Sequence, residues 1–263
     1  MTETRDGVAT LWVGTSWKMN KSLGEARRYA RELDHYLRRT ELAGVQPFII
    51  PSFTAVSATR EALGEDTPVL LGVQNAHWDD HGAWTGEVSV AQAKDAGAQL
   101  VEIGHSERRE HFGETVATTR LKVAAALAHG LVPLLCIGES DEVRRAGESS
   151  RFILDQAAGA LDGLTPEQMK RVLIAYEPVW AIGTGKTSTP KDADDTHRFI
   201  RDMVGRLYSR KAAEDTVIQY GGSVKPNNAK ELMSMENIDG LLVGGASLAA
   251  DSFVPIVRYD AGG

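Results

Sequence analysis

Short apolar runs recur along the whole chain, and amphipathic segments with helical spacing separate them. Each run consists mostly of continuous apolar or β-branched residues, a pattern typical of parallel strands that are buried on both faces. The segments between them, such as Leu23–Leu37 and Asp194–Tyr208, are charged and rich in alanine, as surface helices are. About eight runs are present, at Thr10–Gly14, Pro47–Pro51, Val69–Val73, Leu100–Ile103, Val132–Ile137, Val172–Tyr176, Val217–Tyr220 and Leu241–Val243.

Repeated strand–helix units can close into a barrel or form an open doubly wound sheet. A barrel needs eight units and about 250 residues, and the chain has 263 residues with no Pro/Ser-rich linker between two halves. An open dinucleotide-binding sheet would carry Gly-x-Gly-x-x-Gly after its first strand, whereas here the first run leads into Gly14-Thr15-Ser16-Trp17-Lys18. We therefore predict an α/β chain that forms one (β/α)8 barrel (TIM barrel) over residues 1–263, with residues 1–8 as a flexible N-terminal extension.

Composition excludes several classes of protein. Hydrophobic residues make up 42% of the chain, which is too many for a disordered chain. A net charge of −7 and a pI near 5.5 argue against a nucleic-acid partner. The single cysteine, Cys136, excludes a disulfide framework and a cysteine-rich metal site. The histidines and acidic residues lack the spacing of metal ligands, so we expect neither a metal nor a cofactor.

The N-terminal residues are polar, without the apolar core of a signal peptide. The longest apolar stretches, such as Leu131–Ile137, are far shorter than the roughly 20 residues that cross a bilayer. We therefore expect a soluble cytoplasmic protein that has no membrane partner.

Polar residues gather where the predicted strands end. Because the active site of a βα barrel lies at the C-terminal ends of its strands, these residues should meet at one rim. Lys18 follows the first run, His105 the fourth and Glu177 the sixth, and glycine-rich turns follow the last two runs, at Gly221-Gly222-Ser223 and Gly244-Gly245-Ala246-Ser247. Glycine lets backbone N–H groups approach an anion closely, so the two turns predict a phosphate site.

With a phosphate held at those turns, Glu177 could abstract a proton next to a carbonyl group while His105 and Lys18 polarise that carbonyl. Each of these residues could also have a role that involves no catalysis. Lys18 could be a solvated rim residue, His105 a structural histidine, and Glu177 the cap of a turn or the partner of an arginine. Their position at the same rim favours the catalytic interpretation. Ser106 has no His/Asp partner, so we do not expect a serine triad.

Several long motifs resemble those of the triosephosphate isomerase family, in the order in which that family carries them. The likeness extends from about Leu11 to Val257. The motifs are Trp17-Lys18-Met19-Asn20, Gly104-His105-Ser106-Glu107-Arg108-Arg109, the segment from Tyr176 to Gly185, Tyr220-Gly221-Gly222-Ser223, and the segment from Leu242 to Ser247.

The resemblance implies a role for each matching residue. Glu177 would be the base that moves a proton between two adjacent carbons, and His105 the neutral electrophile that faces the enediolate oxygen. Lys18 would stabilise the negative charge, with Glu107 as the acidic residue behind it. The segment Val179–Thr187 resembles the lid that closes over the phosphate in this family.

The resemblance also implies which groups bind the phosphorylated sugar. Backbone N–H groups of Gly183, Ser223, Gly244 and Gly245 match the phosphate-binding positions of the family. Cys136 matches a buried thiol with a structural role.

Members of the family are usually homodimers in which the loop after the third strand reaches into the partner. Here that loop is Gln74–Glu87, and its two tryptophans, Trp78 and Trp84, would be unfavourable in solvent. We therefore expect a homodimer formed through this loop. The alternative is a loop that packs on its own barrel.

Two departures from the family pattern bear on the substrate. Ser16 stands where the family usually has an asparagine, and Trp84 where it has a phenylalanine. The smaller Ser16 could admit a fourth carbon and bind its hydroxyl group. Both segments resemble the branch of L-erythrulose-1-phosphate isomerases, which act in erythritol breakdown. We therefore favour conversion of L-erythrulose 1-phosphate to D-erythrulose 4-phosphate.

Three alternatives are open at this stage. If the two departures are neutral, the chain is an ordinary triosephosphate isomerase that interconverts dihydroxyacetone phosphate and D-glyceraldehyde 3-phosphate in glycolysis and gluconeogenesis. A Schiff-base aldolase could use Lys18, but acidic neighbours should keep this lysine protonated. A non-catalytic phosphate-binding relative would have no need for Glu177, His105 and Lys18 together.

Overall fold

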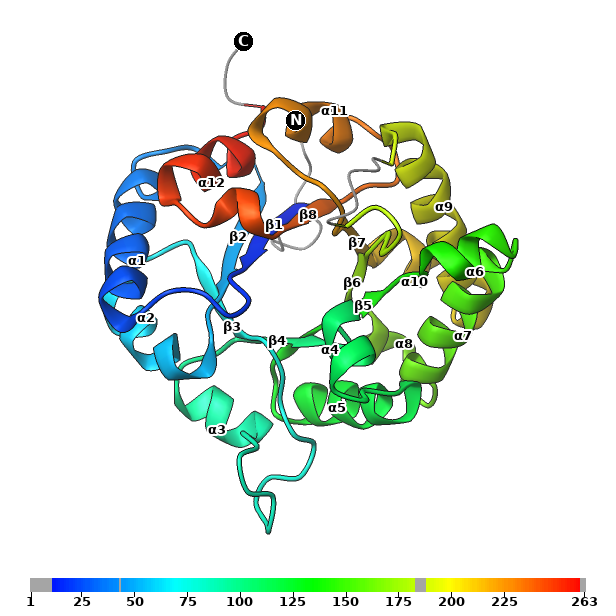
Figure 1. Cartoon of the computed structure of the whole chain (residues 1–263), viewed down its shortest axis with the longest axis horizontal. Coiled ribbons are helices and arrows are strands. Elements are labelled where there is room, and N and C mark those ends of the chain that lie inside the picture. The colour runs from blue at the N-terminus through cyan, green and yellow to red at the C-terminus, as the bar shows by residue number, and fades with distance from the viewer. Residues whose placement is uncertain (1–10, 43, 183–187, 261–263) are drawn as a thin grey trace.

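Eight parallel strands close into a barrel in the order of the sequence, which confirms the predicted fold (Figure 1). The structure is a computed structural model that describes residues 11–42, 44–182 and 188–260. The predicted extension at residues 1–8 lies outside the described residues. The strands are β1 (Leu11–Ser16), β2 (Val45–Ile50), β3 (Leu70–Val73), β4 (Leu100–Ile103), β5 (Val132–Ile137), β6 (Leu173–Tyr176), β7 (Val217–Tyr220) and β8 (Gly240–Val243).

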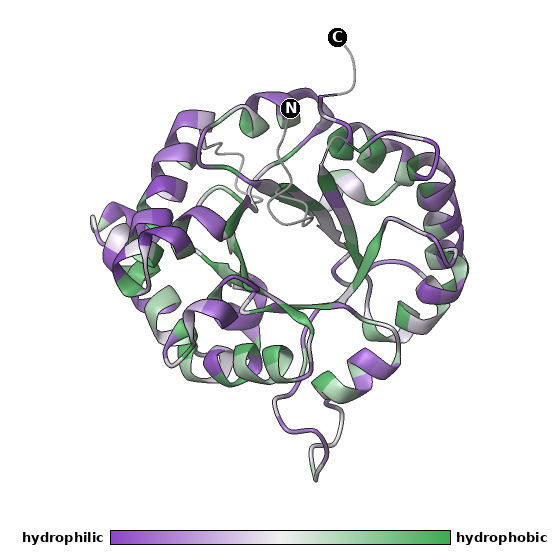
Figure 2. Cartoon of the chain, turned by 180° about the vertical axis from the view of Figure 1, so that it is seen from behind, coloured by the Kyte–Doolittle hydropathy of each residue, from purple (hydrophilic) through white to green (hydrophobic). Residues whose placement is uncertain are grey.

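Helices surround the barrel and turn their hydrophilic faces outward (Figure 2). The described α-helices are α1 (Leu23–Leu37), α2 (Val56–Ala62), α3 (Val90–Asp95), α4 (Ser106–His111), α5 (Val116–Ala128), α6 (Asp141–Arg145), α7 (Ser149–Leu161), α8 (Pro166–Met169), α9 (Pro190–Leu207), α10 (Arg210–Asp215), α11 (Pro226–Met233) and α12 (Ala250–Val257). Two 3₁₀ turns, η1 (Phe53–Ala55) and η2 (Gly245–Ser247), follow β2 and β8. Among the described residues, no helix combines the length and the apolar character that crossing a bilayer requires.

Local sequence signals set where several helices begin. The Ser22 side chain accepts the N–H of Glu25, and the Glu25 side chain accepts the N–H of Ser22, which forms a capping box at the start of α1. Thr165 caps α8 in the same way, with Pro166 at the first helical position. These contacts satisfy backbone N–H groups that have no partner within their own helix.

Side chains alternate across each strand, so one set fills the barrel and the other packs under the helices. The interior set is a cluster that includes Trp12, Phe48, Leu100, Leu134 and Cys136. The second set packs against apolar helix faces in a much larger cluster. Because side chains fill the barrel interior, the barrel is a core and not a channel.

Close packing in the interior requires a glycine in β1. A Cβ atom at Gly14 would lie 2.1 Å from the ring of Phe48, in the neighbouring strand. Since two carbon atoms cannot approach so closely, an alanine here would displace the Phe48 ring or spread the two strands apart.

We predict that Gly14→Ala lowers the free energy of unfolding by about 1–3 kcal/mol, because it overpacks the barrel interior. The matched control is Gly24→Ala in α1, where nothing lies within 4 Å of the added Cβ. The control should leave stability unchanged or raise it by up to about 1 kcal/mol. Urea unfolding of the two variants beside the parent chain measures both effects. Equal stability of the two variants would contradict the packing described here.

Candidate active site

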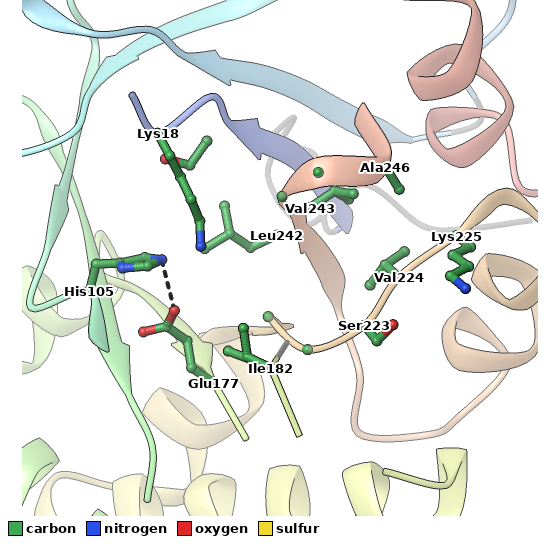
Figure 3. A pocket seen from close by; sticks show the side chains of 15 residues that line it. Lys18, His105, Glu177, Ile182, Ser223, Val224, Lys225, Leu242, Val243 and Ala246 are labelled. Carbon is green, nitrogen blue, oxygen red and sulfur yellow. Dashed lines mark ion pairs between the residues drawn. The ribbon is translucent and has the colours of Figure 1, made fainter. Parts of the chain in front are cut away.

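A cavity of about 210 Å³ opens at the carboxyl ends of the strands (Figure 3). His105 and Glu177 line one side of it, the turns that follow β7 and β8 line the other, and Lys18 lies near the turn after β8. The structure therefore brings together, from five strand ends, the predicted residues Ser16, Lys18, His105, Glu177, Ser223, Gly244 and Gly245.

Glu177 directly follows β6 and is buried, with 2% of its surface exposed. Its Oε1 lies 3.0 Å from Nε2 of His105, and its Oε2 accepts the backbone N–H of Ser106 at 2.9 Å. Burial alone would raise the pKa of this carboxyl group, but His105 and the Ser106 N–H outweigh burial and hold the pKa below its usual value. Glu177 is therefore a carboxylate, as a general base must be.

His105 caps the N-terminus of α4, and both of its ring nitrogens have partners. Burial lowers the pKa of His105, whereas the neighbouring Glu177 carboxylate raises it. However, Nδ1 accepts the backbone N–H of Glu107 at 3.2 Å, and a protonated nitrogen cannot accept a hydrogen bond. We therefore assign the neutral imidazole with its proton on Nε2, from which it donates to Glu177.

Lys18 lies in the loop between β1 and α1, with a backbone φ of +53°. This left-handed conformation costs a non-glycine residue about 1 kcal/mol or more, so contacts must hold it. Gln74, which follows β3, donates through Nε2 to the Lys18 carbonyl at 2.8 Å. The Lys18 ammonium group donates to Oε1 of Glu107 at 2.6 Å. Glu107 thus lies beside the lysine, as predicted.

The glycine-rich turns form the opposite wall of the cavity (Figure 3). A Cβ atom at Gly244 would lie 3.8 Å from Cε of Lys18, so this turn runs close to the cation. Lys225, which follows Ser223, also lines the cavity and adds a second positive charge. We did not single out Lys225 from the sequence, although its position just after a glycine-rich turn is a usable signal.

The predicted lid is described only in part. Gly183 lies outside the described residues, as does the rest of the segment up to Thr187. Before it, Ile182 lines the cavity. Trp180 is buried, and its indole N–H donates to Oε1 of Glu139 at 3.0 Å, which ties the start of the segment to the end of β5.

Ser16 is the last residue of β1 and not part of the loop that follows it. It lines the cavity, and its hydroxyl group donates to Oε2 of Glu102 at 2.8 Å. Glu102 was not among the predicted site residues, although an acidic residue within an otherwise apolar run is a usable signal.

The described side chains give little support for chemistry that depends on a metal ion or on a reactive cysteine. Within residues 11–42, 44–182 and 188–260, no group of three or more His, Cys, Asp or Glu side chains could hold a metal ion. Cys136 is buried in the barrel interior, and burial raises the pKa of its thiol well above the usual value. This environment is suited to an inert, structural thiol.

Comparison with known proteins agrees with the fold. The family model described as triosephosphate isomerase matches residues 11–260. An L-erythrulose-1-phosphate isomerase from Mycolicibacterium smegmatis is 62% identical over 255 residues, which cover 97% of this chain and 95% of that protein. A triosephosphate isomerase from Chloroflexus aurantiacus is 48% identical over 247 residues, which cover 94% of this chain and 98% of that protein. An L-erythrulose-1-phosphate isomerase from Mesorhizobium japonicum is 46% identical over 248 residues, which cover 94% of this chain and 95% of that protein.

The tautomer of His105 can be measured directly. We predict that ¹⁵N NMR at pH 7 shows Nδ1 of His105 unprotonated and Nε2 protonated, because Glu107 donates to Nδ1. The variant His105→Gln identifies the signal among those of the seven histidines. Protonation of both nitrogens at this pH would show that Glu177 holds an imidazolium ion, and the assignment would be wrong.

Proposed function

The chain belongs to the triosephosphate isomerase family, and we propose that it is an isomerase that interconverts L-erythrulose 1-phosphate and D-erythrulose 4-phosphate. The observation that carries the choice of substrate is the 62% identity to an L-erythrulose-1-phosphate isomerase over nearly the whole chain. The triosephosphate isomerases among the relatives reach 44–48% over a similar length.

The two candidate substrates differ by one hydroxymethyl group at the end far from the phosphate. In both reactions the carbonyl group moves from the carbon next to the phosphorylated CH₂ group to the following carbon. The same base, electrophile and phosphate site therefore serve both substrates, and discrimination depends on the space and partners for the extra group. Ser16, which replaces a larger asparagine of the family pattern, lines the cavity and supplies both space and a hydroxyl group.

In the proposed reaction, Glu177 takes the proton from C3 of L-erythrulose 1-phosphate, next to the C2 carbonyl. To do so its carboxylate must release Ser106 and His105, its present partners. His105 donates from Nε2 to the developing oxyanion and moves a proton from the C3 oxygen to the C2 oxygen. Lys18 stabilises the negative charge of the enediolate. Glu177 then returns its proton to C2, which leaves the carbonyl group on C3.

We assign the phosphate group to the opposite wall of the cavity. Backbone N–H groups of Ser223, Gly244 and Gly245 would bind it, with Gly183 as a further donor on the resemblance alone. The positive charge of Lys225 favours an anion on this side, in a chain whose overall net charge is −7. No step of this reaction needs a metal or an organic cofactor.

Triosephosphate isomerase activity is the second candidate, since relatives of that name cover 93–94% of this chain. An aldolase that uses Lys18 as a Schiff base is less well supported. The Lys18 nitrogen is held by the Glu107 carboxylate at 2.6 Å, and the Glu177–His105 pair would have no role in a Schiff-base reaction.

A homodimer formed through the loop Gln74–Glu87 is part of the proposal. The loop projects beyond the barrel between β3 and α3 (Figure 1). The centre of the His77 ring lies 4.1 Å from the ring centre of Trp78 and 4.4 Å from that of Trp84. Trp84 is 48% exposed. An aromatic cluster with a half-exposed indole is suited to burial against a partner.

On the resemblance of the motifs, we also propose that the enzyme acts in erythritol catabolism in the cytoplasm.

We predict that kcat/KM of the purified protein is at least about 100-fold higher for L-erythrulose 1-phosphate than for dihydroxyacetone phosphate. The control Glu177→Asp, which moves the carboxylate back by about 1 Å, should lower turnover by about 100-fold or more and show that the activity belongs to this site. Equal or better turnover of the triose would make the second candidate the correct one.

We also predict that sedimentation equilibrium gives a mass twice the chain mass of 28.5 kDa. The variant Trp84→Asp should shift the protein toward the monomer, because it would place a charge in the proposed interface. Leu207 is 45% exposed and ends α9, which precedes β7 on the far side of the barrel from β3, so Leu207→Asp provides the matched control (Figure 1). A parent chain that sediments as a monomer would refute the dimer.

A further inference from the structure

Glu102 is a carboxylate within the barrel interior. It stands in β4 two residues after Leu100, which belongs to the interior cluster, so both side chains point into the barrel. Only 2% of Glu102 is exposed. Burying an acidic group costs free energy. An acidic residue in an otherwise apolar strand therefore indicates a specific role.

The two carboxyl oxygens of Glu102 differ in their contacts with the described residues. Oε2 accepts the hydroxyl proton of Ser16 at 2.8 Å. Oε1 is buried and has no hydrogen-bond partner among the described residues. Because Ser16 donates its proton to Glu102, the lone pairs of its own oxygen are left for another donor, and Ser16 lines the cavity.

Groups that line the cavity influence the protonation of Glu102. Burial raises the pKa of Glu102, and Glu177 adds to the rise, while His105, Ser16 and Lys18 oppose it. If Oε1 carries a proton, it is a donor, and if the group is ionised, it is an acceptor. A substrate hydroxyl group can donate and accept, so it pairs with Glu102 in either form.

The two partners reach each other across the barrel interior. Glu102 stands in β4, which lies across from β8 and the proposed phosphate site, whereas Ser16 ends β1, which pairs with β8. Glu102 therefore holds the Ser16 hydroxyl group on the side that faces away from the turn after β8. The reacting carbons would lie between His105 and Glu177. The end of the substrate that is far from the phosphate therefore points toward the β4 side.

We propose that Ser16 and Glu102 form a hydroxyl-binding subsite that selects the four-carbon substrate. Ser16 contacts the terminal hydroxyl group, and Glu102 is the positioning residue that turns the Ser16 oxygen toward it. This inference rests on the proposed function. A triose lacks the hydroxyl group and leaves these buried polar atoms without a partner, which weakens its transition state relative to that of the longer substrate.

The test compares L-erythrulose 1-phosphate with its 4-deoxy analogue, which has a methyl group in place of the hydroxymethyl group. The parent chain should lose about 100-fold in kcat/KM with the analogue. Glu102→Leu, similar in shape but apolar, should reduce that loss to less than about 5-fold, because the subsite no longer recognises the hydroxyl group. Glu102→Gln keeps an acceptor for Ser16 and should restore most of the discrimination.

A structural role for Glu102 would lower activity on both substrates by the same factor and leave their ratio unchanged, which would overturn the inference. If Glu102→Leu does not fold, Ser16→Ala carries the same test, since it removes the contacting oxygen and should abolish the discrimination. A parent chain that turns over L-erythrulose 1-phosphate and the analogue equally well would refute this subsite alone. A parent chain that accepts only trioses would refute the proposed function, and the subsite with it.

Discussion

The pairing of β8 with β1 closes the sheet, and the geometry of the cavity depends on it. The two strands are parallel, with Trp12 opposite Gly240 and Gly14 opposite Leu242. A Cβ atom at Gly240 would lie 1.9 Å from the carbonyl oxygen of Trp12, so the approach requires a glycine. Closure brings the turn at Gly244 beside Lys18 and leaves β4 and β6, which position His105 and Glu177, on the other side of the cavity. Residues far apart in sequence thereby meet at one rim.

Opposite charges and hydrogen bonds hold each functional group before any substrate arrives. Glu107 pairs with Lys18, His105 with Glu177, and Glu102 with Ser16. Such preorganisation lets fixed donors stabilise the charge of an enediolate without a large rearrangement. Glu177 is the exception, because its present contacts with Ser106 and His105 must break before it can reach a carbon atom. The proposed reaction therefore includes a movement of the base.

Much of the fold and of the cavity was predictable from the sequence. The eight apolar runs predicted the eight strands, because buried parallel strands need continuous apolar residues. Lys18, His105 and Glu177 were found because the ends of parallel strands share one rim. Glu102 was missed because its importance depends on which face of β4 it occupies and on Ser16, 86 positions away. The contact of Glu177 with the Ser106 backbone was not predictable either, since it depends on how the loops after β4 and β6 are placed relative to each other.

The proposed reaction depends on Glu177, which moves a proton between C3 and C2 of a four-carbon phosphosugar. The most direct test is to run the reaction in D₂O with L-erythrulose 1-phosphate and follow the product by NMR. We predict deuterium at the carbon that receives the proton, because a carboxylic acid formed on Glu177 can exchange with solvent before it returns the proton. We also predict that Glu177→Gln forms no deuterated product above background. Full retention of the substrate hydrogen, together with undiminished turnover by Glu177→Gln, would contradict proton transfer through Glu177.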